Sequence, residues 1–164
     1  METEPWLRGP IADVPAHLMP VFFSFAQVRE DLAKHTPGIT GNQIWRQIAG
    51  KHSLGYHLKH IAGSVDRLVT YLAGHQLSQD QLAFLRNEHM ADGELDALLA
   101  LVHSSLRAAE RQLLQVKPES LFEPRVVGWQ ELPTTVLGLL VHLCEHTQRH
   151  LGQAILISKL LRQG

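Results

Sequence analysis

Hydrophobic residues recur at intervals of three and four positions in four separate stretches of this chain. The first stretch carries Leu18, Val21, Phe22, Phe25, Val28 and Leu32. Residues spaced in this way lie on one face of an α-helix, so the pattern predicts a helix that ends before Pro37-Gly38. The second stretch predicts a helix over residues 54–72, with Ser53 capping its start and Gly74 closing it.

The other two stretches lie in the second half of the chain. Residues 95–116 repeat the helical spacing, with Asp92 as the expected cap and Pro118 beyond the end. The last helix is expected from near Pro133 to about Leu161. Proline suits the first position of a helix because the amide hydrogen that it lacks would be unpaired there.

A shorter helix is expected over Ser78 to Asn87, between the second and third stretches. No segment shows a convincing alternation of hydrophobic and polar residues, which would indicate a β-strand. The pattern therefore predicts an all-α four-helix bundle with one short extra helix, and the interior of such a bundle is a common place for metal and ligand sites. The length predicts a single domain over residues 1–164.

Composition and charge narrow the classes of function. Hydrophobic residues make up 45% of the chain and charged residues 19%, and the formal net charge is −1. This balance gives no attraction to nucleic acid or to an anionic membrane, so we expect neither as a partner. The longest apolar run, residues 136–141, is too short to span a bilayer, and the first nine residues lack the pattern of a signal peptide. We therefore expect a cytoplasmic protein.

Histidines stand one helical turn apart in the last expected helix, at positions 142, 146 and 150. Residues four apart can lean toward one point, so His146 can share an ion with His150 or with His142. His142 and His150 lie about 12 Å apart along the axis, which is too far for one ion. A third ligand must come from elsewhere, and the second helix offers His57 and His60. A helical wheel slightly favours His57, which lies nearer the centre of the apolar face.

Two motifs resemble the signature of the DinB-like (DinB/YfiT) family of bacterial four-helix-bundle proteins. The first is His146-Thr147-Gln148-Arg149-His150-Leu151-Gly152-Gln153, in which two histidines enclose three residues and Gly-Gln follows after one more. The second begins Ser53-Leu54-Gly55 and places His60, with an apolar residue behind it, seven positions after the serine. The motifs stand in the family's order, and the resemblance covers essentially the whole chain.

The resemblance implies a divalent metal site made by His60, His146 and His150, with zinc or nickel as the usual ion. It favours His60 against the helical wheel and leaves His57 as the alternative ligand or as a neighbour of the site. It also implies a homodimer. Some relatives are transferases or isomerases that use low-molecular-weight thiols, and many others have no known activity.

These observations lead to a divalent-metal-binding protein that acts on a small molecule, as a metal-dependent hydrolase or a thiol-dependent transferase. Three nitrogen ligands leave a tetrahedral zinc ion one open position for a water or a thiol. Two alternatives stay open: a non-enzymatic metal-binding or dimeric scaffold bundle, and a plain bundle whose histidines bind nothing. No catalytic side chain is assigned. Glu145 is expected to pair with Arg149, and Cys144, the one cysteine, to be a buried unreactive thiol.

Overall fold

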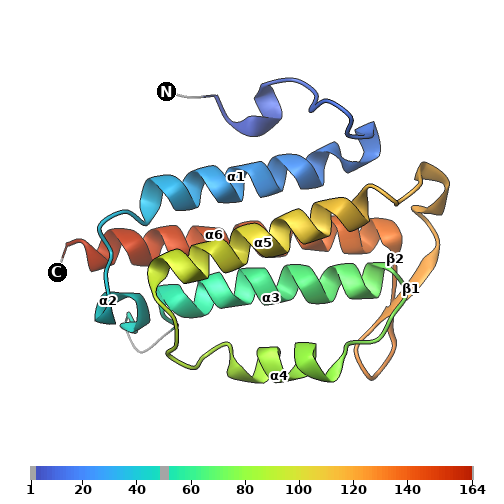
Figure 1. The fold of residues 1–164 in the computed structure, drawn as a ribbon. Coiled ribbons are helices and arrows are strands. Elements are labelled where there is room, and N and C mark those ends of the chain that lie inside the picture. Colours follow the sequence, from blue (N-terminus) through green and yellow to red (C-terminus); the bar gives the residue numbers. More distant parts are fainter. Residues whose placement is uncertain (1–2, 49–51, 164) are drawn as a thin grey trace.

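A computed structural model describes residues 3–48 and 52–163 of the chain, and residues 1–2, 49–51 and 164 lie outside the described part. In the described ranges, four long helices lie side by side: α1 (Met19–His35), α3 (Leu54–Leu72), α5 (Leu95–Leu113) and α6 (Val136–Leu161) (Figure 1). Helix α6 packs against both α1 and α3, and α3 also packs against α5. The predicted all-α bundle is therefore confirmed.

Shorter elements connect the long helices. They are the 3-10 helices η1 (Pro5–Leu7), η2 (Ala16–Leu18) and η3 (Pro118–Ser120), the helices α2 (Asn42–Trp45) and α4 (Gln79–Asn87), and the strands β1 (Pro124–Val127) and β2 (Leu132–Thr135). Helix α4 is the predicted extra helix. Ser78 caps it in a capping box, because its side chain accepts from the Gln81 amide while the Gln81 side chain accepts from the Ser78 amide.

The expectation that the chain contains no strand is wrong for residues 124–135. Strands β1 and β2 form an antiparallel hairpin in which Pro124 pairs with Thr135 and Val127 with Leu132. Each strand has only four residues, one of which is a proline, so the alternation that marks a strand is too short to recognise. Pro133 consequently lies in β2 and does not open the last helix. That helix begins at Val136 after Thr135.

The expected cap of α5 is also wrong. The residue before this helix is Glu94, whose side chain makes no capping hydrogen bond, and Asp92 lies two residues further back. The Asp92 carboxylate instead accepts a hydrogen bond from the Lys59 ammonium of α3 at 2.7 Å. Asp92, which the sequence suggested as a cap, is therefore engaged in an ion pair with the buried Lys59 side chain.

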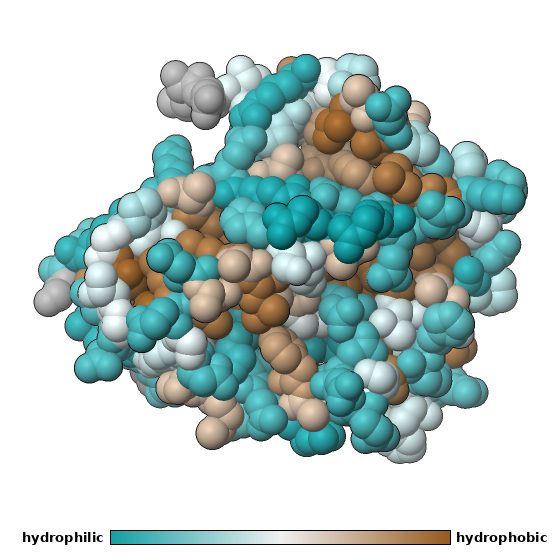
Figure 2. Space-filling model, in the orientation of Figure 1, coloured by the Kyte–Doolittle hydropathy of each residue, from teal (hydrophilic) through white to brown (hydrophobic). Residues whose placement is uncertain are grey.

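The core consists of the apolar faces of the four long helices. Phe25, Leu58, Leu106 and Leu143, one from each, are at most 1% exposed. Burying each such side chain stabilises the fold by about 1.5–3 kcal/mol relative to leaving it in water. Hydrophilic residues cover much of the face in Figure 2, with hydrophobic residues visible between them. In the described residues, no helix combines the length and apolar character needed to cross a membrane.

Candidate metal centre

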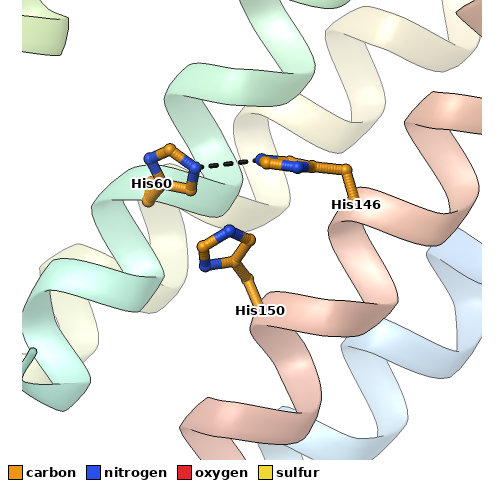
Figure 3. Close-up of side chains that lie close together, drawn as sticks. All are labelled: His60, His146 and His150. Carbon is orange, nitrogen blue, oxygen red and sulfur yellow. Dashed lines mark hydrogen bonds between the residues drawn. The ribbon is translucent and has the colours of Figure 1, made fainter.

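The interface between α3 and α6 brings three histidine side chains together. His60 comes from α3, and His146 and His150 come from successive turns of α6. One ring nitrogen from each lies within 4.8 Å of the others. The Nε2 atoms of His60 and His146 are 2.9 Å apart, and the ring centroids of His60 and His150 are 4.2 Å apart. Figure 3 shows the three rings pointing toward one another across the gap between the two helices.

The three rings suit a borderline transition-metal ion. Zinc–nitrogen bonds of about 2.0–2.1 Å place two ligating nitrogens roughly 3–3.5 Å apart. The 2.9 Å separation of the His60 and His146 Nε2 atoms is close to this range, so a small movement of the rings would admit an ion. Imidazole nitrogens are ligands that zinc, nickel, copper and iron accept. The donor set therefore fits the group that the sequence motifs imply.

His57 lies beside this group and is not part of it. Its ring is 1% exposed, and its Nδ1 atom is 3.0 Å from Nδ1 of His150. The helical wheel favoured His57 because it faces the centre of the core. The three nitrogens instead meet near the edge of the α3–α6 interface, where His60 keeps 13% of its side-chain area exposed. The structure thus places His57 as a neighbour of His150.

The third histidine of the series 142, 146 and 150 on α6, His142, is turned toward the surface. Its Nδ1 atom lies 2.6 Å from a carboxylate oxygen of Glu145, three residues further along α6. The other oxygen of Glu145 accepts from Arg149, so the expected i,i+4 ion pair is present. Glu145 is therefore engaged on the outer face of α6 and away from the three converging rings.

A buried carboxylate that the sequence did not reveal touches the site. Glu88, the residue after α4, is 2% exposed. One of its oxygens lies 2.7 Å from Nδ1 of His60, within hydrogen-bond distance, and the other accepts from Arg67 at 2.8 Å. Glu88 lies 28 residues after His60 and outside α3, so no helical spacing in the sequence connects them. The only sequence signal would have been an acidic residue at the end of a short helix.

The sequence model of the DinB superfamily matches residues 24–154. The chain belongs to the DinB superfamily. The matched region extends from α1 into α6 and contains His60, His146 and His150. A comparison with curated protein sequences finds no match.

Burial keeps three histidines of this DinB-superfamily site, His57, His146 and His150, neutral near pH 7. Loss of hydration is the largest cause of the lowered pKa values, and nearby imidazoles, His60 among them, add to it. The pKa is lowered to about 4 for His57, to about 4 for His146 and to about 3 for His150. Neutral imidazole has a lone pair that a metal ion can use, so these rings need not lose a proton to bind one.

The second ring nitrogen of His146 lacks a protein partner. Its Nδ1 atom is buried and has no hydrogen bond to any residue in the described part of the DinB-superfamily chain. Buried polar atoms in a purely structural core are normally paired. The Nδ1 atom is therefore an exception in this core, whereas Nε2, which faces His60, is the atom of this ring that an ion between the two helices would contact.

An aromatic stack lies along one side of the site. The Tyr56 ring stacks on His60 with centroids 5.4 Å apart, and the exposed His52 ring stacks on Tyr56 at 3.9 Å.

Cys144 is not among the converging ligands, and burial raises the pKa of its thiol to about 11. Its side chain is only partly buried, but the expectation of an unreactive thiol agrees with this protonated state.

Proposed function

We propose that this DinB-superfamily chain binds one divalent transition-metal ion, zinc or nickel, through His60, His146 and His150. The observation that carries the proposal is the convergence of one nitrogen from each ring within 4.8 Å, from two helices that the core holds side by side. The 2.9 Å approach of the His60 and His146 Nε2 atoms supports it. Three protein ligands leave a position open in a tetrahedral site.

We further propose that the site acts on a small molecule, by hydrolysis or by transfer of a low-molecular-weight thiol. A bound ion would supply Lewis-acid chemistry by lowering the pKa of a water or thiol at its open position. The contacts of the two carboxylates Glu88 and Glu145 support a mechanism in which the ion, and not an acidic side chain, activates the water or thiol. Glu88 is engaged by His60 and Arg67, and Glu145 by His142 and Arg149. Neither is free to act as a general base, so the protein's part is to hold neutral imidazoles in place.

A homodimer is the assembly that we propose for this chain. Support comes from apolar side chains that α6 exposes, of which Val141 and Leu156 are 58% and 57% exposed. Exposed apolar residues on a long helix favour packing against another surface. Sedimentation equilibrium of the purified protein should give twice the mass of the chain, and a mass equal to that of one chain would contradict this assembly.

Metal content measured by mass spectrometry tests the binding proposal. We expect about one ion per chain in untagged protein, since one nitrogen from each of three histidines converges on one point. His60→Ala and His150→Ala should each lose the ion because two imidazoles rarely retain zinc. His142→Ala is the matched control, because it removes an exposed histidine of the same helix that is outside the group. Wild-type protein that retains no ion after incubation with zinc or nickel would overturn the proposal.

Turnover assays separate the enzyme from a scaffold that only binds metal. Metal-loaded wild-type protein and His150→Ala should be compared on hydrolysable esters and amides and on thiol-transfer acceptors supplied with small thiols. Activity that follows metal occupancy across the variants would support the catalytic proposal. A fully loaded protein without activity in either panel would favour the non-enzymatic metal-binding bundle.

A further inference from the structure

The structure connects a buried carboxylate to one member of the histidine group. One oxygen of Glu88 lies 2.7 Å from Nδ1 of His60, and the other accepts a hydrogen bond from the Arg67 guanidinium at 2.8 Å. We propose that Glu88 is a positioning residue, which keeps the proton of His60 on Nδ1 and so directs the Nε2 lone pair at the ion. This inference rests on the proposed metal site.

The direction of the hydrogen bonds carries the first step. An ionised carboxylate has no proton to donate, so the contact with His60 requires a hydrogen on Nδ1. In a neutral imidazole the other nitrogen, Nε2, then has the free lone pair. This is the atom that lies 2.9 Å from Nε2 of His146. The contact with Glu88 therefore selects the tautomer in which His60 can act as a ligand toward the other rings.

The backbone of α3 is built to admit the Glu88 carboxylate. His60, Gly63 and Arg67 lie on one face of this helix, because they are three and four residues apart. A Cβ atom at Gly63 would lie 2.6 Å from an oxygen of Glu88 and 2.7 Å from Nη1 of Arg67. It would also lie 2.6 Å from the Phe84 ring, so a side chain at this position would crowd the carboxylate, the guanidinium and this ring together. The absence of a side chain at Gly63 is thus a requirement of the contact.

A second buried cation fixes the chain around Glu88. The side chain of Lys59 is 6% exposed, and its ammonium donates to the carbonyl oxygens of Asn87 and Met90 at 3.0 and 3.2 Å. Asn87 directly precedes Glu88, and Met90 lies two residues after it. Lys59 and Arg67 therefore hold the end of α4 against α3 from two sides, and the position of the carboxylate does not depend on its bond to His60 alone.

The three histidines differ in the partner of the nitrogen that faces away from the group. His60 has the Glu88 carboxylate, His150 has the neutral ring of His57, and His146 has no partner in the described part of the chain. A carboxylate is a stronger hydrogen-bond acceptor than a neutral imidazole, and it raises the basicity of the histidine ring that it holds. His60 is therefore the ligand whose orientation depends most on residues outside the group.

Histidine side-chain nitrogen NMR on metal-free protein at alkaline pH tests the tautomer directly. We expect wild-type His60 to carry its hydrogen on Nδ1, and Glu88→Gln to give a mixture, because one amide oxygen cannot serve both His60 and Arg67. Wild-type His60 with its hydrogen on Nε2 would overturn the inference. The wild-type spectrum decides the question even if a variant folds poorly.

Zinc titration of the same proteins gives the second readout. Glu88→Gln and Gly63→Ala should weaken zinc binding by about tenfold to a hundredfold, the usual effect of losing the partner of a metal-bound histidine. Glu110→Gln is the matched control, because Glu110 pairs with Arg29 at 2.8 Å and lies on α5, which carries none of the three converging histidines. A dissociation constant for Glu88→Gln equal to that of Glu110→Gln would contradict the inference. Wild-type protein that has the Nδ1 tautomer but binds no zinc would instead defeat the proposed function.

Discussion

At the scale of single residues, the site depends on imidazoles that stay neutral. The largest cause of their lowered pKa values is burial, and the lone pairs that would bind a metal are the same groups that acid would protonate. The same burial that keeps these lone pairs available near neutral pH therefore lowers the stability of the folded chain in acid. This loss of stability can be measured on protein kept metal-free with a chelator.

The metal-free protein should lose stability as the pH falls from about 6.5, the pKa of an unfolded histidine, to about 3. Over this window the unfolded chain binds protons at His57, His146 and His150, whereas the folded chain does not until pH 3–4. Because the unfolded state binds more protons, acid favours unfolding. Thermal denaturation across the window should show a smaller loss for His150→Gln than for wild type. An equal loss in both would contradict the assignment.

The Cys144 thiol should react slowly with alkylating reagents near neutral pH. Burial raises its pKa to about 11, so almost none of it is the reactive thiolate under these conditions. Mass spectrometry after iodoacetamide treatment should show much slower modification of the native protein than of the same protein in urea. Cys144→Ser should retain the metal. Loss of the ion from this variant would indicate that the thiol is a metal ligand and would contradict the prediction.

At the scale of the elements, the sequence was informative where the pattern repeats over several turns. The four long helices follow from their apolar spacing, although the cap expected for α5 and the start expected for α6 were wrong. The hairpin of β1 and β2 is too short to be recognised. The histidine pair of α6 also followed from spacing. The choice of His60 over His57 required the family resemblance, because a wheel shows the core face and not the edge of an interface. Glu88 was missed because its contacts form only in three dimensions.

The caps of α3 and α6 should contribute measurably to stability. Ser53 accepts from the Tyr56 amide at 3.1 Å, and Thr135 accepts from the Gly138 amide at 3.1 Å. Replacing either by alanine should lower the free energy of unfolding by about 1 kcal/mol. Ser104→Ala, on the exposed face of α5, is the matched control and should change little. Urea denaturation that gives the same stability for all three variants would rule out this role for the caps.

At the scale of the whole molecule, the proposed ion would connect α3 to α6 near the edge of their interface. These two helices already pack against each other, so the ion would add to an existing contact and would not create the fold. A ligand that binds only the folded chain stabilises it in proportion to the logarithm of its concentration over its dissociation constant. Metal binding should therefore appear in the stability of the entire bundle.

Zinc should raise the melting temperature of the wild-type protein, and a chelator should reverse the change. At a free zinc concentration a hundredfold above the dissociation constant, the free energy of unfolding rises by about 2.7 kcal/mol. Scanning calorimetry of wild type and His60→Ala at equal zinc concentrations measures it, and the variant should show no increase. An equal increase in both proteins would mean that zinc binds elsewhere on the chain.

Anomalous diffraction tests the three-histidine site most directly. Crystals grown with zinc should be measured on both sides of the zinc absorption edge. The account predicts one strong peak between Nε2 of His60 and the rings of His146 and His150, at bonding distance of about 2.0–2.1 Å from each. A zinc-saturated crystal with no peak between these rings, or with its peak on other side chains, would contradict the account.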